Sequence, residues 1–528
     1  MKLQPNLTKL RWIVAVLFVS IITSNTLSNA QSNENLLTPS KISNGLLGEG
    51  TNWSMSWRVV ESGTPGPTVV VLGGIHGNEP AGYRAATQIQ EWPIVAGKLV
   101  VLPCVNRLGT AANMRWFPEF RNDKKLRDMN RNFPMNERLD PRTPLADSVW
   151  QFVKQQDPDW VFDLHEGFDF HRENAKSVGS SVISFPEYSE FGKLLQRTVN
   201  TDIPAKRQFV LLDQKGPVAG SLARACRERL EAKSFILETT FKDQAVSTRT
   251  RQHRQMVSAA FRAIGITDKD CVDNLAPPKP TAQTRVAIFD GNGTSEANLV
   301  RLLDRQPNIY ATQIGPRDLK AEVLNQFDIV LLPGGSGGKQ GRDMKETGRD
   351  SIRQFVHQGG GVVGICAGAY LCSSHYDWSL DLFNASVFNQ TVDVPEVGKK
   401  SMWYRGKPAD VEVELTTKGE TIFGPSPVKL VRYHNGPILS PGDQPSSPTY
   451  ETLAMFRSEV SLYEAQKNTM VNTPAIVTSR FGQGRVIAIS PHFESTPGQE
   501  NKVLAAIEYV RRQRQERKPD TSAVTNDE

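Results

Sequence analysis

The sequence predicts an α/β protein of two domains, each a three-layer α/β/α arrangement with helices on both faces of a sheet. The chain has 528 residues, which is too long for a single hydrophobic core. Short apolar runs bounded by turn residues alternate with helical segments, as they do in sheets covered on both faces. One segment rich in proline and polar residues, 273–284, interrupts this alternation. We therefore expect one domain on each side of it.

The first alternation of strands and helices covers residues 67–265. The runs "TVVVLGG", "KLVVLPCVN", "WVFDLHEG" and "SFILETT" predict buried strands. Helices are predicted for "LADSVWQFVKQQ", for "SLARACRERLEA" and for residues 242–264. These elements indicate a first domain over 45–266, followed by a linker over 267–284.

The second alternation begins directly after the linker. The runs "RVAIFDG", "FDIVLLPGG" and "GGVVGICAGAYL" predict strands, with helices near 295–304 and 346–358 between them. Residues 380–495 are richer in strand and loop. We expect a second domain over 285–500, then a terminal helix and a disordered polar tail over 501–528.

The N-terminus has the pattern of an export signal. Basic residues precede the apolar segment 12–22, and the polar run "TSNTLSNA" ends at a cleavage site after Ala30. We expect a signal peptide over 1–30 and a periplasmic or secreted protein. The alternative is a single N-terminal membrane anchor. No later apolar run approaches membrane length, so we expect no stable membrane span once the signal is removed.

Composition excludes several classes of protein. The net charge of +6 is small for this length, and part of it lies in the run "VRRQRQERK", which is typical of a solvated helix. We therefore expect no nucleic-acid partner. Five cysteines without a C-x-x-C pair exclude a disulfide scaffold. The oligomeric state is not determined by these features.

Polar residues at strand ends indicate a metal site in the first domain. His76 and Glu79 follow an apolar strand in "GGIHGNEPAG". His165 lies at the end of another strand, in "DLHEG", with Asp163 as an outer partner. A catalytic zinc needs about three protein ligands and one open position, and ligands gather at the carboxyl ends of strands. His171 is the rival third ligand, but it lies beyond the strand in a charged loop.

Two further segments would complete a hydrolytic site. Glu238 lies at the end of the strand "FILETT", where a carboxylate could act as the general base of a zinc hydrolase. Between the other motifs, "RDMNRNFP" carries Asn130 and Arg131. The Arg131 guanidinium suits two-point contact with a substrate carboxylate, and Asn130 would be an adjacent hydrogen-bonding group.

These four motifs, in this order, resemble the zinc carboxypeptidase superfamily. The form H-G-N-E-P-A-G is most similar to the succinylglutamate desuccinylase/aspartoacylase branch, and the resemblance covers residues 45–265. It implies a mixed sheet, Zn²⁺ as the cofactor, and His76, Glu79 and His165 as its ligands.

The resemblance also implies roles for the remaining residues. Asn130 and Arg131 would bind the free carboxylate of the substrate, and Glu238 would activate water and then protonate the leaving amine. Arg115 is the candidate for steadying the oxyanion, with Arg107 as the alternative. We expect a small-molecule or peptide substrate that carries a free carboxylate.

The second domain contains a nucleophile pattern. In "GICAG", Cys366 stands between glycines at a strand end, and the following helix N-terminus would lower a thiol pKa. "LLPGG" could offer backbone N–H groups to an oxyanion. His492 and Glu494 in "SPHFE" are spaced so that the carboxylate could orient an imidazole base. His434 in "YHNGP" is a second candidate base.

Residues 284–500 resemble class I glutamine amidotransferase-like domains, most closely the type likened to the N-terminal region of biotin–protein ligase. The resemblance implies a flavodoxin-like sheet with Cys366 as nucleophile, His492 as its base and Glu494 as third member. Glutamine amidotransfer needs a synthase domain that accepts the ammonia, and none is visible in the sequence. The alternative is therefore a binding or regulatory domain that keeps the turn at Cys366.

The combined expectation is an exported zinc hydrolase. It would cleave an amide bond next to a free carboxylate, either as a carboxypeptidase on small or cell-wall peptides or as an N-acyl amino acid deacylase. One alternative is a non-catalytic envelope protein that binds peptides. Another is a thiol amidase that acts through Cys366.

Overall fold

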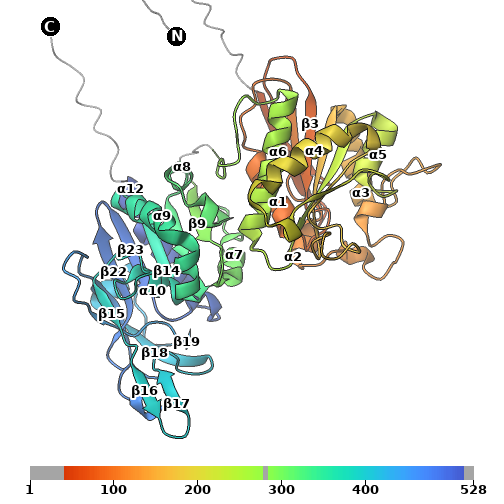
Figure 1. Cartoon of the computed structure of the whole chain (residues 1–528). Coiled ribbons are helices and arrows are strands. Elements are labelled where there is room, and N and C mark those ends of the chain that lie inside the picture. Colours follow the sequence, from red (N-terminus) through yellow and green to blue (C-terminus); the bar gives the residue numbers. More distant parts are fainter. Residues whose placement is uncertain (1–40, 278–282, 516–528) are drawn as a thin grey trace, which may run out of the picture. The chain divides into compact units, whose positions relative to one another are not determined.

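The computed structural model describes residues 41–277 and 283–515 (Figure 1). They form two large sheets with helices on both faces, which confirms the predicted α/β fold class. The predicted signal peptide, residues 1–30, lies outside the described residues. Among the helices that are described, none combines the length and apolar character needed to cross a bilayer.

The first sheet is mixed. Strands β3, β4, β5 and β8 run parallel to one another, whereas β1 and β2 at one side and β6 at the other pair antiparallel to a neighbour. In spatial order the strands are β1 (Lys41–Leu47), β2 (Met55–Glu61), β4 (Lys98–Leu102), β3 (Thr68–Gly73), β5 (Trp160–Gly167), β8 (Lys233–Thr240), β6 (Ser181–Ile183) and β7 (Val210–Leu212).

Alternate residues of the central strands face two different helix layers. Val69 and Val71 of β3 belong to the core under α1 (Pro80–Ile89), α4 (Ser189–Val199) and α6 (Val246–Ile264). Val70 and Leu72 face the opposite core, under α3 (Pro144–Gln156) and α5 (Leu222–Leu230). This is why the strands are apolar throughout: burial on both faces leaves no solvent-facing side.

Two glycines of "GGIHGNEPAG" bring helix α1 close to the sheet. A Cβ on Gly73 would lie 2.5 Å from the carbonyl oxygen of Gly82. A Cβ on Gly82 would lie 2.5 Å from the carbonyl oxygen of Leu164 on β5. Only hydrogen fits at either position, so these glycines fix the approach of the strand-to-helix turn to the neighbouring strand.

The second sheet begins with five parallel strands in the flavodoxin-like order 2-1-3-4-5 and continues with antiparallel strands. The parallel strands are, in spatial order, β11 (Ile309–Ile314), β9 (Thr284–Phe289), β12 (Ile329–Leu332), β14 (Gly361–Ile365) and β23 (Gly484–Ile489). The sheet then continues through β22 (Pro474–Phe481), β21 (Glu451–Phe456), β18 (Ala409–Leu415) and β19 (Lys429–Tyr433).

Helices cover both faces of this sheet as well. One core includes residues of α8 (Ala321–Leu324), α9 (Gly337–His357) and α10 (Ala367–Cys372). The other includes residues of α7 (Ala297–Leu303), α11 (Thr417–Phe423) and α12 (Asn501–Gln515). The helix predicted near 346–358 is the second part of α9, because Lys345, at φ 56°, interrupts the helical backbone.

Small elements occupy the connections. Three pairs of short strands lie outside the main sheets, and helix α2 (Arg107–Ala111) follows β4. The pairs are β10 (Thr294–Ser295) with β13 (Gly334–Gly335), β15 (Ala385–Val387) with β20 (Leu439–Pro441), and β16 (Thr391–Val394) with β17 (Gly398–Ser401).

Candidate metal centre and thiol site

Three neighbouring strands of the first sheet deliver the predicted metal ligands and base. His76 and Glu79 lie in the turn after β3, His165 lies on β5, and Glu238 lies on β8. The order β3-β5-β8 makes these strands adjacent, and His165 is directly opposite Glu238 in the register. The carboxyl ends of parallel strands therefore gather residues that are far apart in the sequence.

His76, Glu79 and His165 form a compact cluster. One ligand atom from each lies within 4.8 Å of the others, and the three residues are 3%, 2% and 1% exposed. His76 Nδ1 is 3.1 Å from His165 Nδ1. The two carboxylate oxygens of Glu79 lie 2.8 Å from His76 Nδ1 and 2.9 Å from His165 Nδ1. Two imidazole nitrogens and a carboxylate thus converge on one point.

Carboxylates hold the far nitrogen of each imidazole. His76 Nε2 is 3.1 Å from Asp128 Oδ1, and His165 Nε2 is 2.9 Å from Asp163 Oδ2. A carboxylate at Nε2 retains the proton there and leaves the Nδ1 lone pair free to bind a cation. Nitrogen ligands of a tetrahedral zinc are separated by about 3.3 Å, close to the distance found here. The donor set therefore fits a zinc ion.

The electrostatics of the cluster agree with a cation site. Burial opposes the charge of His165, but the carboxylates of Asp163 and Glu79 raise the pKa of His165 well above its ordinary value. Burial likewise opposes the charge of Asp128, and the hydrogen bond to His76 lowers the pKa of Asp128 well below its usual range. The Asp128 carboxylate therefore stays negative and favours a positive charge at the cluster.

Glu238 lies beside this cluster. It is 8% exposed, and burial raises its pKa to about 8. Its Oε2 has no hydrogen-bond partner among the residues that the structure describes. A buried carboxylate oxygen without a protein partner is costly unless it serves a bound group.

The predicted substrate-binding and oxyanion residues are close by. The Asn130 amide nitrogen is 3.3 Å from His165 Nε2, and its oxygen accepts a bond from the backbone N–H of Leu222. Arg131 donates to the Asn130 carbonyl. Arg115 donates to Glu79 Oε1 over 2.6 Å. Arg115 therefore reaches the cluster directly.

The two rival residues have other surroundings. Arg107 is the first residue of α2, and its charge acts on the thiol of Cys104. His171 Nδ1 lies 2.7 Å from the carbonyl oxygen of Ser177. Within the part of the chain that the structure describes, the candidate metal cluster contains His165 and does not contain His171.

Sequence reasoning missed two parts of the site. Asp128, the partner of His76, begins the motif "DMNRNFP" and could have been noted as a carboxylate beside two candidate residues. Glu166 follows His165, is fully buried in an ion pair with Arg249 of α6, and accepts a hydrogen bond from the backbone N–H of Ala81. No local pattern links Glu166 to a helix 83 residues later.

The structure brings the residues predicted for the thiol site, Cys366, His492 and Glu494, close together. Cys366 lies between β14 and α10 in a strained backbone conformation, φ 52° and ψ −102°. His492 Nδ1 is 2.5 Å from Glu494 Oε1. Burial opposes the charge of His492, yet hydrogen bonds to Cys366 and Glu494 raise its pKa to about 10. His434 has an exposed side chain, and its carbonyl accepts a bond from Cys366 Sγ.

The neighbouring glycine makes room for this arrangement. A Cβ on Gly334 would lie 3.0 Å from His492 Cε1 and 3.7 Å from Cys366 Cβ. Cys366 and His492 both line a cavity of about 550 Å³. Cys366 and His492 therefore face a space that could admit a ligand.

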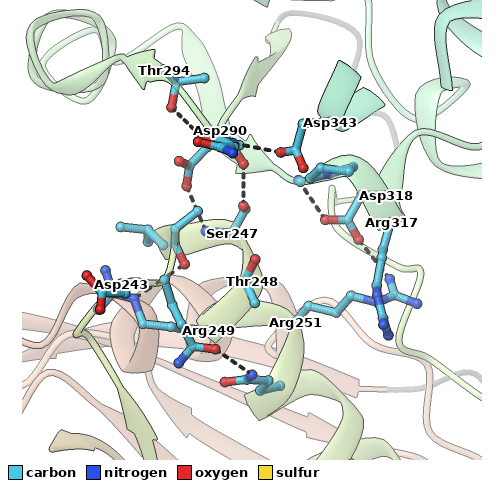
Figure 2. A pocket seen from close by; sticks show the side chains of 18 of the residues that line it. Asp243, Ser247, Thr248, Arg249, Arg251, Asp290, Thr294, Arg317, Asp318 and Asp343 are labelled. Atoms are coloured by element: carbon cyan, nitrogen blue, oxygen red, sulfur yellow. Dashed lines mark hydrogen bonds and ion pairs between the residues drawn. The ribbon is translucent and has the colours of Figure 1, made fainter. Parts of the chain in front are cut away.

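A larger hollow of about 1060 Å³ has a different character (Figure 2). It is lined by polar and charged side chains that include Asp318 and Asp343. These carboxylates accept bonds from the backbone N–H groups of Gly315 and Asn292. Neither the His-Glu-His cluster nor Cys366 lines it, so we place both candidate catalytic sites elsewhere.

Two family models match separate parts of the chain. Residues 65–259 match the family model described as succinylglutamate desuccinylase/aspartoacylase catalytic domain, and residues 284–525 match that described as biotin-protein ligase, N terminal. An uncharacterized protein of Chlamydia muridarum is 27% identical over 192 residues, which are 34% of this chain and 68% of that protein.

Solved structures are similar over part of the chain. A variant of cell shape determinant protein Csd4 from Helicobacter pylori has a TM-score of 0.34 at 18% identity, over 44% of this chain and 64% of its own. A succinylglutamate desuccinylase/aspartoacylase from Rhodobacter sphaeroides has a TM-score of 0.31 at 17% identity, over 44% of this chain and 66% of its own. This chain spans less than two thirds of both.

The two family models match the parts of the chain in which the sequence motifs lie. Residues 65–259 are similar to the succinylglutamate desuccinylase/aspartoacylase catalytic family, and residues 284–525 are similar to the biotin-protein ligase N-terminal family.

Proposed function

We propose that the first domain is a zinc-dependent hydrolase that cleaves an amide bond next to a free carboxylate. The observation that carries this proposal is the convergence of two Nδ1 atoms and Glu79, with a carboxylate behind each imidazole. The family match supports a hydrolase of the carboxypeptidase or deacylase type.

The residues divide the chemistry between them. Zinc would be held by His76, Glu79 and His165, and when bound it would polarise the scissile carbonyl and make water a better nucleophile. Glu238 takes a proton from the attacking water and passes it to the leaving amine. The water oxygen bonds to the carbonyl carbon as the C–N bond breaks, which yields a carboxylic acid and an amine.

Basic and amide side chains would position the substrate. Arg131 and Asn130 would bind the free carboxylate, and this contact would select bonds adjacent to it. Arg115, which donates to Glu79, is near enough to the cluster to stabilise charge that develops on the carbonyl oxygen. The predicted export makes cell-wall peptides and small N-acyl amino acids the substrates to test.

The test measures product release by mass spectrometry. The mature chain, loaded with zinc, is incubated with N-acyl amino acids and cell-wall peptides, with and without a chelator. Release of an amino acid that the chelator abolishes and zinc restores is the expected result. The cleaved substrate separates a deacylase from a carboxypeptidase. Stable binding without release from the zinc-loaded protein would overturn the enzyme proposal and favour a non-catalytic peptide-binding protein.

A second activity is supported by a separate observation. His492 Nδ1 pairs with Glu494 over 2.5 Å, and His492 and Cys366 line the same cavity, which is consistent with the nucleophile–base–orienter arrangement of a thiol hydrolase. We infer that the second domain hydrolyses an acyl compound through Cys366. Activity that persists with chelator and is lost in Cys366→Ser would support this role, whereas unchanged activity in Cys366→Ser would refute it.

A further inference from the structure

Aromatic and uncharged polar residues make up most of the lining of the cavity at Cys366, and the His492 imidazole that also lines it is paired with Glu494. Within the described part of the chain, no aspartate, glutamate, lysine or arginine lines it. The basic side chains that do so are the imidazoles of His434 and His492. Five aromatic residues line it, namely Tyr370, Tyr376, Trp378, Trp403 and Tyr404.

Four of these aromatic residues form two ring pairs. Tyr376 and Trp378 are stacked, with centroids 4.4 Å apart and planes 10° apart. The Tyr376 hydroxyl accepts a bond from the amide of Asn389, which lines the same cavity. Trp403 and Tyr404 meet edge to face and are 42% and 43% exposed. Ring faces that are open to a cavity can bind another flat or apolar group.

Two charged residues that adjoin lining residues, Arg405 beside Tyr404 and Glu494 beside His492, have partners within the protein. Arg405 is buried, and its guanidinium donates to the carbonyl of Val460 and the hydroxyl of Thr469. Glu494 is paired with His492. Neither offers an ionic partner to a ligand in the cavity.

This distribution of charge bears on which acyl group can enter. The acyl part of glutamine carries an α-ammonium and an α-carboxylate, and each would lose hydration on entering such a cavity. Burial of an ion is costly unless a charge of opposite sign and hydrogen bonds replace the water. A neutral acyl group with a flat apolar face has no such cost, and it buries apolar surface against the rings.

We propose that the thiol site hydrolyses amides or esters whose acyl group is uncharged and carries a flat apolar face, rather than glutamine. This inference rests on the proposed thiol activity of the second domain. Cys366 Sγ bonds to the acyl carbon while His492 takes the thiol proton. The C–N or C–O bond then breaks, and His492 gives this proton to the leaving amine or alcohol. Water next attacks the thioester, the C–S bond breaks, the acid is released, and the thiol regains its proton through His492.

The test compares two substrates with the same leaving group on the full-length protein. These are the 4-nitroanilides of 4-phenylbutanoate, which is neutral, and of γ-L-glutamate, which carries both charges. The neutral anilide should react with a kcat/KM at least about tenfold higher. Trp378→Ala should lower that value about tenfold, whereas Leu430→Ala, at a residue 61% exposed on β19, should leave it unchanged. Cys366→Ser should abolish the reaction.

A competition experiment with two alkylating labels distinguishes two errors. Either the proposed class of acyl group is wrong, or Cys366 does not hydrolyse acyl compounds at all. Cys366 is alkylated in competition by a phenyl-bearing chloromethyl ketone and by the γ-chloroketone analogue of glutamine, and adducts are counted by mass spectrometry. Faster turnover of the γ-glutamyl anilide would overturn the substrate class and retain the hydrolase. No turnover of either, with preference for the neutral label, would overturn the hydrolase alone. No turnover and no preference would overturn both.

Discussion

His76 and His165 direct their Nδ1 atoms at each other across 3.1 Å, although 89 residues separate them in the chain. Each ring is held from behind by a carboxylate, Asp128 or Asp163. A pair of nitrogen lone pairs this close is unfavourable unless a proton or a cation lies between them. The arrangement of the rings is therefore itself an argument for a metal centre.

Removing a carboxylate behind an imidazole should weaken metal binding. Asp128→Asn keeps the shape but loses the charge that holds the Nε2 proton of His76, and zinc affinity should fall about 10–100-fold. Competition with a chromophoric chelator measures this affinity. Asp147→Asn, on the surface-facing side of α3, is the matched control and should bind zinc as the wild type does. Unchanged affinity in Asp128→Asn would contradict the role of Asp128.

Replacing the predicted base should separate metal binding from turnover. Glu238→Gln leaves the three ligands in place but cannot accept a proton, so the rate should fall about 10²–10⁴-fold or more. Bound zinc, measured by atomic absorption, should stay at the wild-type stoichiometry. Wild-type turnover in this variant would refute the assignment of Glu238. Loss of zinc together with activity would instead identify Glu238 as a ligand.

The close approach of α1 to β5 predicts an intolerant glycine. A Cβ at Gly82 would meet the carbonyl oxygen of Leu164 at 2.5 Å, and backbone on both sides cannot yield without shifting the helix. Gly82→Ala should lower the free energy of unfolding by about 1–3 kcal/mol. Gly338→Ala, whose Cβ would meet only the end of the Arg342 side chain, should be neutral or stabilising. Urea unfolding of both variants measures the difference.

The pair His492–Glu494 predicts a pH-dependent contribution to stability. The pKa of His492 rises from 6.5 to about 10 on folding, so its contribution is fully present below pH 6.5 and is lost as pH rises through about 10. Glu494→Gln removes part of this effect. The free energy of unfolding of Glu494→Gln should therefore fall further below that of the wild type at pH 6 than above pH 10. Urea titrations of both proteins at the two pH values measure this difference. An equal deficit at both values would contradict the pairing.

The motif residues that define the first domain could be located from the sequence. "GGIHGNEPAG", "DLHEG" and "FILETT" each place a ligand or a carboxylate at the end of an apolar run, and such runs end at the same edge of a parallel sheet. The strand predicted at "WVFDLHEG" is β5 residue for residue. Local apolar patterning is strong here because these strands are buried on both faces.

Other features depended on contacts that no local pattern encodes. The pairing of His76 with Asp128, the ion pair of Glu166 with Arg249, and the aromatic wall around Cys366 all join segments distant in the sequence. By itself, the sequence determined the α/β class, the turn that holds Cys366 and the residue types at the strand ends. Only the tertiary structure decided which side chains face one another, because strand order and helix packing set those distances.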